Sequence, residues 1–209
     1  MSAMLYVGQR RFMTLLHSLQ QSYHRIRSTP VATLLQQIAR ASAPSHLDQA
    51  VNALQRRIWH LSLPESMSLR AQLIDALSAC VGCAPHPALR MSAAEWLRVL
   101  TQTGLAPDPQ AVFVTLVTAA ARLQHDAAGA RCEQLAYLEA LRECFWAFRY
   151  PYPAYAWEMF PTTHIFYPLA PLFTAMDQDM QEVLLTIFAE LPRLDDPKIT
   201  AYIPQVRRS

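Results

Sequence analysis

Glycine is scarce in this sequence, and its scarcity excludes two kinds of nucleotide-binding site. Only four of the 209 residues are glycine, and no two of them lie close together: Gly8, Gly82, Gly104 and Gly129. A P-loop or a Rossmann dinucleotide-binding turn needs several glycines within one turn, because the backbone must approach a phosphate closely. The sequence therefore contains neither of these sites.

Long apolar runs are also lacking. The longest apolar-leaning run, residues 111–121, has eleven residues and includes two threonines. A membrane-spanning helix needs about 20 apolar residues, so we expect none here. The first residues have no apolar stretch after a basic start, which argues against a signal peptide. Four cysteines in a chain of this length do not predict a disulfide scaffold, and we expect a cytoplasmic protein.

Charged residues are fewer than in an average domain. They make up 16% of the chain, against about 25% in typical soluble domains, and 52% of the residues are hydrophobic. A chain with this much apolar surface can bury a core and is not expected to be disordered. We therefore expect a single helical domain over residues 1–209, with a subdivision near residues 82–91 as the alternative.

The charges that are present are unevenly distributed. Residues 1–60 carry seven arginines and one acidic residue, whereas residues 133–196 carry three arginines and ten acidic residues. Such asymmetry can mark a face for nucleic acid or for an acidic partner. The alternative is that a basic part and an acidic part of one fold face each other.

Apolar residues recur with a helical period along most of the chain. In residues 4–27 six of them fall on one helix face: Phe12, Leu15, Leu16, Leu19, Tyr23 and Ile26. The same period predicts helices over about 30–42, 45–61, 64–79, 92–103, 108–124, 130–148 and 177–191. Residues 112–117 would also suit a buried strand, but no strong second strand candidate can pair with them, so we expect a helix there.

Residues that favour helix ends support this division. Residues 45–48 form a weak capping box, and residues 92–95 form a clearer one that opens the fifth helix. Asp108 precedes a proline at the expected start of the sixth helix. Gly104 stands where a glycine commonly ends a helix.

The sequence thus predicts an all-α fold. We expect an orthogonal or layered bundle of eight to nine helices. Residues 149–171 contain five prolines, which exclude a long regular helix. They predict a long connection, rich in proline and aromatic residues, near the C-terminus.

This connection is the most unusual feature of the sequence. Seven aromatic residues stand within eighteen positions: Tyr150, Tyr152, Tyr155, Trp157, Phe160, Phe166 and Tyr167. Aromatic rings with a polar group suit an interface, and prolines lower the entropic cost of presenting one. We interpret these residues as a partner-binding surface. The alternative is an ordered loop whose rings fill gaps against the helices.

Cys80 and Cys83 have the spacing of half a zinc site or of a redox pair. A zinc site needs two more ligands at short spacing, and His86 is the one candidate nearby. A thioredoxin-like role needs a βαβ context, which the helical pattern does not provide. We therefore expect no metal and no cofactor, and interpret the two cysteines as buried at a helix end.

A set of arginines in the N-terminal part could contact phosphates: Arg10, Arg11, Arg25, Arg27, Arg40, Arg56 and Arg57. On helices these positions point in several directions, and no nucleic-acid-binding motif accompanies them. A solvated helix surface is the simpler interpretation. Nucleic-acid binding through Arg10, Arg11, Arg25, Arg27, Arg56 and Arg57 is the alternative.

No catalytic motif is present. The sequence has neither the Gly-x-Ser-x-Gly turn of a hydrolase nor a Glu-x-x-His pair of a di-iron site. We therefore predict a non-enzymatic helical protein that binds other proteins within a larger assembly, as an adaptor, accessory subunit or chaperone. The alternative is a nucleic-acid-binding subunit that uses the arginine-rich N-terminal helices. The sequence identifies no partner and no oligomeric state.

Overall fold

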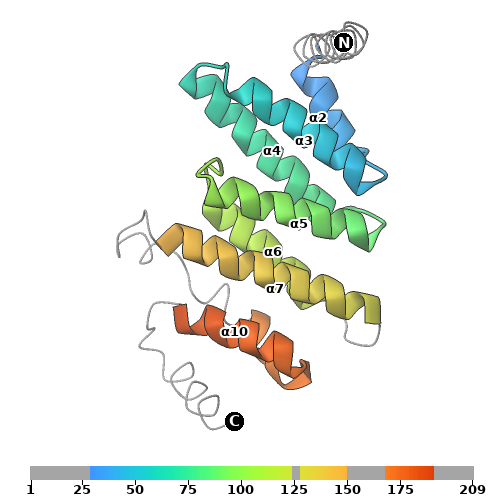
Figure 1. The fold of residues 1–209 in the computed structure, drawn as a ribbon, viewed down its shortest axis with the longest axis vertical. Coiled ribbons are helices and arrows are strands. Elements are labelled where there is room, and N and C mark those ends of the chain that lie inside the picture. Colours follow the sequence, from blue (N-terminus) through green and yellow to red (C-terminus); the bar gives the residue numbers. More distant parts are fainter. Residues whose placement is uncertain (1–28, 124–127, 150–167, 191–209) are drawn as a thin grey trace, which may run out of the picture.

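The computed structural model describes residues 29–123, 128–149 and 168–190, and these residues are helical throughout apart from short turns (Figure 1). They form α2 (Val31–Ala39), α3 (Pro44–Ile58), α4 (Leu63–Cys83), α5 (Pro87–Gln102), α6 (Pro109–Arg122), α7 (Ala128–Arg149), the 3-10 helix η1 (Ala170–Ala175) and α10 (Gln178–Glu190). The all-α prediction is confirmed for this part of the chain. The helix expected over residues 4–27 lies outside it, so the total of eight to nine helices stays a prediction.

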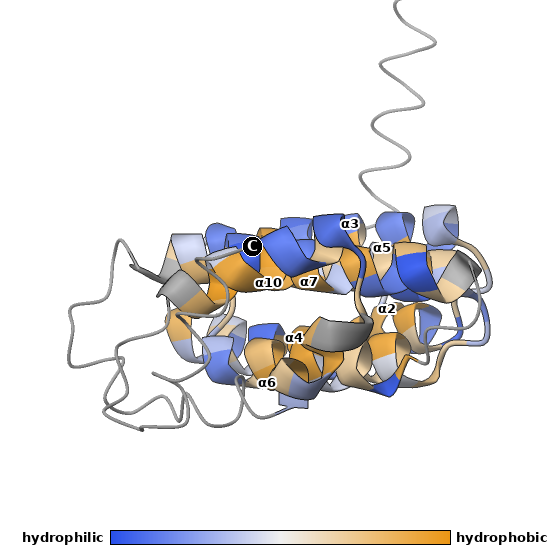
Figure 2. Ribbon diagram, turned by 90° about the horizontal axis from the view of Figure 1, so that it is seen from below, coloured by the Kyte–Doolittle hydropathy of each residue, from blue (hydrophilic) through white to orange (hydrophobic). Residues whose placement is uncertain are grey.

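The helices form two layers that face each other, and within each layer they are stacked along the long axis of the molecule. Helices α2, α4 and α6 lie in one layer, and α3, α5, α7 and α10 lie in the other (Figures 1 and 2). Within a layer, every second helix of the chain packs side by side, as α2 with α4 and α5 with α7 do. From α2 to α7, helices that follow each other in the chain pack against each other across the two layers. This is the stacking pattern of α-solenoids, in which each helix pair contacts only its neighbours.

The core lies between the two layers. Each helix buries one side, and the most buried side chains are leucines at helical spacing, among them Leu47, Leu54, Leu77, Leu97 and Leu116. Near the middle, the rings of Phe113 in α6 and Phe145 in α7 stack with centroids 4.7 Å apart. The buried residues form one cluster that reaches from α2 to α10.

Two helix ends follow the sequence prediction. Asp108 caps α6, because its Oδ1 accepts from the backbone N–H of Gln110 at 3.0 Å. Gly104 ends α5 with a positive φ of 67°, which glycine adopts without steric cost. The backbone N–H of Leu105 then returns to the carbonyl of Leu100 at 2.8 Å, and that of Gly104 returns to Thr101 at 3.1 Å. These bonds are those of a Schellman motif.

Both predicted capping boxes are wrong. Helix α3 begins at Pro44, before residues 45–48, and α5 begins at Pro87, so Ser92 lies inside that helix. Proline suits the first helical position, because its missing N–H has no partner there in any case. The structure instead has a capping box at the start of α4. The Glu65 carboxylate accepts from the Ser62 N–H at 3.2 Å and the Ser62 hydroxyl at 2.6 Å, which holds the pKa of Glu65 below its usual value.

Helix α4 also extends beyond its expected end. It continues from residue 79 to Cys83 and includes Gly82 in its last turn. Val81 is buried in this turn, and its packing offsets the low helix propensity of the exposed glycine beside it. Residues 112–117 are helical as expected. None of the helices in the described ranges has the length and apolar character needed to cross a membrane.

Candidate partner-binding groove

Most of the residues that the sequence marks as functional lie outside the described part of the chain. This holds for all seven partner-binding aromatics, namely Tyr150, Tyr152, Tyr155, Trp157, Phe160, Phe166 and Tyr167. It also holds for four of the arginines proposed for nucleic acid, namely Arg10, Arg11, Arg25 and Arg27. Their roles stay predictions.

The two remaining arginines of that set lie side by side in the last turn of α3. Arg56 is exposed, whereas Arg57 is half-buried and donates to the backbone carbonyl of Thr29. Positive charge in a last helical turn also interacts favourably with the helix dipole. Both residues thus have structural explanations at their positions.

The two cysteines of the Cys-x-x-Cys spacing differ in burial. Cys80 is buried and burial raises the pKa of its thiol, while Cys83 is exposed. The expectation that both are buried is therefore wrong for Cys83. His86 is exposed in the turn that follows. Across the described residues, no group of three or more His, Cys, Asp or Glu side chains could hold a metal ion.

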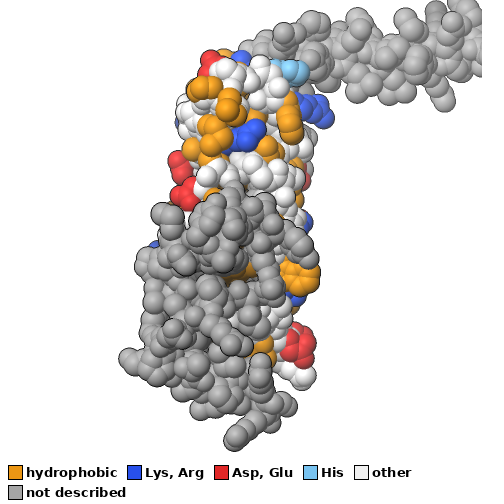
Figure 3. All heavy atoms as spheres, turned by 90° about the vertical axis from the view of Figure 1, so that its left-hand side faces the viewer, with side chains coloured by type: hydrophobic (Ala, Val, Ile, Leu, Met, Phe, Trp, Pro, Cys, Tyr) orange, Lys and Arg blue, Asp and Glu red, His pale blue; other side chains and the backbone are white. Residues whose placement is uncertain are grey.

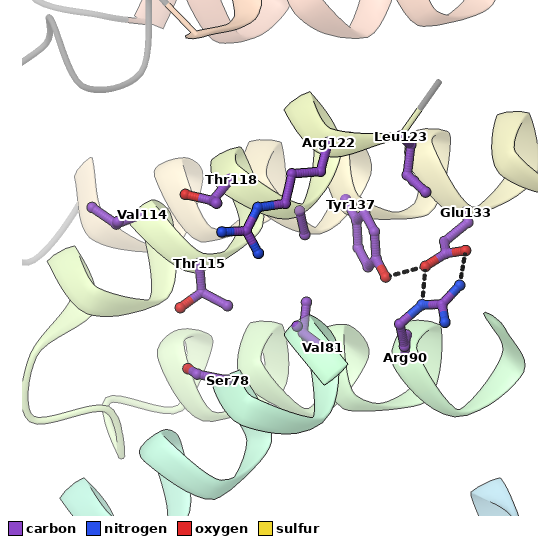
Figure 4. Close-up of a pocket in the computed structure, with 12 residues that line it drawn as sticks. Ser78, Val81, Arg90, Val114, Thr115, Thr118, Arg122, Leu123, Glu133 and Tyr137 are labelled. Carbon is purple, nitrogen blue, oxygen red and sulfur yellow. Dashed lines mark hydrogen bonds and ion pairs between the residues drawn. The ribbon is translucent and has the colours of Figure 1, made fainter. Parts of the chain in front are cut away.

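A groove between α4 and α6 is the best candidate site in the described residues. It holds a pocket of about 380 Å³, and residues of four helices line it (Figure 4). The lining consists of Ser78, Val81 and Gly82 of α4, Arg90 of α5, Val114, Thr115, Thr118, Ala119 and Arg122 of α6, Leu123 just after α6, and Glu133 and Tyr137 of α7. The pocket is half open to solvent. It combines an apolar floor with a few polar groups, as binding pockets commonly do.

Two exposed apolar side chains lie near the start of α4, outside the lining of this pocket. Leu63 is 73% exposed and Met67 is 41% exposed. By helical spacing they lie on the same side of α4 as Ile74 and Ser78. Val114 of α6, at the pocket itself, is 40% exposed. Figure 3 shows hydrophobic side chains at the surface beside a basic one, at the height of α3 and α4 in Figure 1.

One wall of the pocket is a buried polar network. The Arg90 guanidinium donates to both oxygens of Glu133, from Nε at 2.6 Å and from Nη2 at 2.8 Å. Its Nη1 donates to the backbone carbonyl of Ala84 at 2.6 Å, just after the end of α4. The Tyr137 hydroxyl donates to the same Glu133 carboxylate. Because the bonds of this network are satisfied, the wall is already formed without a ligand.

The network fixes the charge of each member. Burial of Glu133 acts to raise its pKa, but the hydrogen bonds from Arg90 and Tyr137 outweigh burial and leave this pKa below its usual value. Burial, and then the bond to Glu133, raise the pKa of Tyr137 far above its usual value. The Glu133 bond likewise raises the pKa of Arg90. Near neutral pH the wall is therefore one ion pair and one neutral phenol.

On the opposite side of the pocket, Arg122 extends from the last turn of α6. Its side chain runs back along α6 past Thr118 toward Thr115, and Ser78 lines the same pocket from α4 (Figure 4). The Thr115 hydroxyl donates to the carbonyl of Ala111 at 2.9 Å. The ion pairs of the described residues do not include Arg122. Within the described residues, its charge is therefore not paired with a carboxylate.

Sequence reasoning missed this groove for a physical reason. Met67 and Val114 belong to helical patterns in which every apolar residue is expected in the core. Periodicity shows that a helix side is apolar, but it does not show whether another element covers that side. The available signal was the breadth of the apolar arc on α4, which includes both Leu69 and Met67.

Comparisons with known proteins add no identification. No protein family matches this chain, and no curated protein and no solved structure matches it either.

Proposed function

We propose that this protein is a non-enzymatic helical adaptor, accessory subunit or chaperone that holds a segment of another protein in the α4–α6 groove. One observation carries the proposal: a preformed pocket lies between α4 and α6 with the exposed Val114 in its lining, and two further exposed apolar side chains, Leu63 and Met67, stand near the start of α4. Exposed apolar surface rimmed by polar groups is typical of interaction sites. The stacked helix pairs of solenoids commonly use such an extended surface for binding.

The low charge of the surrounding layer supports the same proposal. Helices α2, α4 and α6 together contain four charged residues, namely Glu65, Arg70, Asp75 and Arg122. Charged side chains are depleted at the centres of protein interfaces, because they must lose water there. The exposed side chain of Met67 on α4 can also adapt its shape to different partners.

The titratable groups of the groove favour binding over catalysis. Glu133 is held as an anion between Arg90 and Tyr137, and the bond to this carboxylate keeps the phenol protonated. A general acid or base works best with a pKa near the operating pH. Both groups are shifted away from neutrality, so they serve as a structural wall in this proposal.

The experiment selects peptide ligands from a random library displayed on phage, using the full chain. Met67→Asp places a charge among the exposed apolar side chains of α4 and is expected to weaken binding of the selected peptides at least about tenfold, because apolar contact is replaced by a desolvated carboxylate. Ser68→Asp is the matched control, since it adds the same charge at the neighbouring exposed position of α4. Peptides that bind both variants equally, or a selection without ligands, would contradict the proposal.

The predicted aromatic surface of residues 150–167 is a second part of this proposal. Alanine at Tyr155 and Trp157 should weaken association with a partner and leave the unfolding transition unchanged. Loss of the fold would instead identify these rings as core. The nucleic-acid alternative predicts binding that weakens steeply with salt, because counterions are released at each phosphate contact; no described residue favours it.

A further inference from the structure

The geometry of the pocket points to the chemistry of its occupant: we propose that Arg122 binds the carboxylate of an aspartate or glutamate in the docked segment. The inference rests on the proposed function, because it concerns a partner held in the same groove. Beyond the proposed function, the inference specifies which kind of partner side chain enters the pocket and which residue of this protein binds that side chain.

The charges that line the pocket do not cancel. Glu133 neutralises Arg90, and Tyr137 is a neutral phenol, so the lining keeps the single positive charge of Arg122. A ligand with one negative charge balances this charge, whereas a basic ligand is repelled. Charge complementarity therefore favours an acidic side chain.

The polar groups around Arg122 suit a carboxylate in particular. A guanidinium presents paired N–H donors that match the two oxygens of a carboxylate. Ser78 and Thr118 line the same pocket, and their hydroxyls can turn to donate to the remaining lone pairs (Figure 4). The apolar side chains of Val81 and Val114 line the pocket beside them and fit the methylene groups of aspartate or glutamate.

A second arginine, Arg70, lies on α4 between the exposed Met67 and the pocket residue Ser78. By helical spacing Arg70 follows Met67 and precedes Ile74 and Ser78 on the same side of that helix. Its Nε is buried and has no hydrogen-bond partner. An unpaired buried donor is costly, but the Nε is not exposed, so the Arg70 side chain would have to turn outward to reach an acceptor in a docked segment.

The spacing along α4 defines the order of residues in the occupant. Met67 and Ser78 are eleven positions apart, which is about 16 Å along a helix. An extended chain covers this distance in about five residues. The docked segment should therefore carry an apolar side chain and an acidic one about five residues apart.

The test uses synthetic peptides made from the phage-selected sequences, in pairs that differ only by glutamate or glutamine at the acidic position. Binding to the full chain is measured by fluorescence anisotropy. Arg122→Ala should weaken the glutamate peptide roughly tenfold, about 1.4 kcal/mol, and leave the glutamine peptide unchanged. Arg56→Ala is the matched control, because it removes an exposed arginine from the other layer.

Charge reversal gives a second, independent measurement. Selection on Arg122→Glu should enrich peptides with lysine or arginine at the position that is acidic for the wild type. Affinity of the glutamate peptide for the wild type should fall with added salt, since Arg122 is exposed and its interaction is screened. Thermal unfolding of each variant checks the fold, where loss of a last-turn arginine should cost no more than a few degrees.

The outcomes separate the two proposals. Two results would overturn the role of Arg122 and leave the groove proposal standing. The first is that the selected peptides depend on Met67 but show no preference for an acidic residue. The second is that Arg122→Ala weakens the glutamate and the glutamine peptide equally. A selection that never depends on Met67 overturns both. Self-association that Met67→Asp abolishes, seen by sedimentation, would identify a second copy of the chain as the occupant and overturn the peptide proposal.

Discussion

The two helical layers share one core but differ in the surfaces that they present. Helices α3, α5, α7 and α10 contain fifteen charged residues, whereas α2, α4 and α6 contain four (Figure 2). The charge-poor layer supplies most of the pocket lining and two exposed apolar side chains near the start of α4, Leu63 and Met67. The difference shows that one layer presents mainly charged side chains to water, while the other keeps apolar side chains at its surface, as the proposed binding role requires.

The layers also differ in what joins neighbouring helices. In the charge-rich layer each pair of neighbours has a polar link. Trp96 Nε1 of α5 donates to Asp48 Oδ1 of α3 at 2.7 Å, and Arg90 of α5 pairs with Glu133 of α7. The Arg131 guanidinium of α7 lies 2.5 Å from Asp177, which directly precedes α10. Helices α2, α4 and α6 are joined to the same stack mainly through apolar side chains. Directional links in one layer can fix the register of the whole stack.

The largest expected effect comes from breaking the strongest of these links. Glu133→Ala leaves the Arg90 charge and the Tyr137 hydroxyl without their shared partner. We expect the free energy of unfolding to fall by about 3 to 5 kcal/mol, as for other broken buried ion pairs. Urea denaturation measures it. Glu139→Ala, on the exposed side of the same helix, is the control and should change stability by less than about 0.5 kcal/mol. A loss equal to that of the control would show that the link does not stabilise the stack.

Acid should weaken the same link. The pKa of Glu133 is lower in the folded chain than its usual value, so its stabilisation is complete above the unfolded pKa of about 4.3. This contribution is lost as the pH falls below that value and through the folded pKa. We therefore expect Glu133→Gln to lose less stability than the wild type between pH 6 and about 3. Parallel loss in the two proteins, measured by urea denaturation, would contradict this role.

A smaller effect is expected at the α3–α5 link. Trp96→Phe removes the indole N–H that donates to Asp48 and keeps most of the apolar contact. Because Asp48 is only partly buried, water can replace the lost donor, and we expect a loss of about 1 kcal/mol. Trp59→Phe, at a position 71% exposed, gives the comparison and should be nearly neutral. Equal losses would remove the polar link as the explanation.

The smallest effect on stability is expected in the charge-poor layer. Met67→Asp changes an exposed side chain, so the free energy of unfolding should change by no more than about 0.5 kcal/mol. Its effect should appear in binding alone. A large loss of stability would show that Met67 contributes to the core and would erase the functional difference between the layers.

Local signals predicted much of the helix pattern. Asp108 and Gly104 set helix ends by chemistry within a few residues, and the period of residues 112–117 was correctly interpreted as helical. The starts of α3 and α5 were misplaced, because proline at the first helical position competes with nearby capping residues. Such errors stay local and leave the order of the helices unchanged.

The layers and the site could not be predicted in the same way. Arg90 and Glu133 are 43 residues apart, and nothing in their local sequence pairs them. The stacking repeats in space without self-similarity in the sequence, because each helix needs only an apolar side of suitable width. Leu69 and Met67 follow the same pattern in α4, yet one is buried and the other exposed.

Because polar links join the helices of one layer and mainly apolar contacts join those of the other, the two layers should differ in stiffness. Hydrogen bonds and ion pairs lose their energy over a short displacement, whereas apolar contacts slide more easily. We therefore expect the layer of α3, α5, α7 and α10 to resist displacement of its helices more than the layer of α2, α4 and α6 does. Bending of the described stack should then change the spacing of α4 and α6 before that of α5 and α7, and with it the width of the groove.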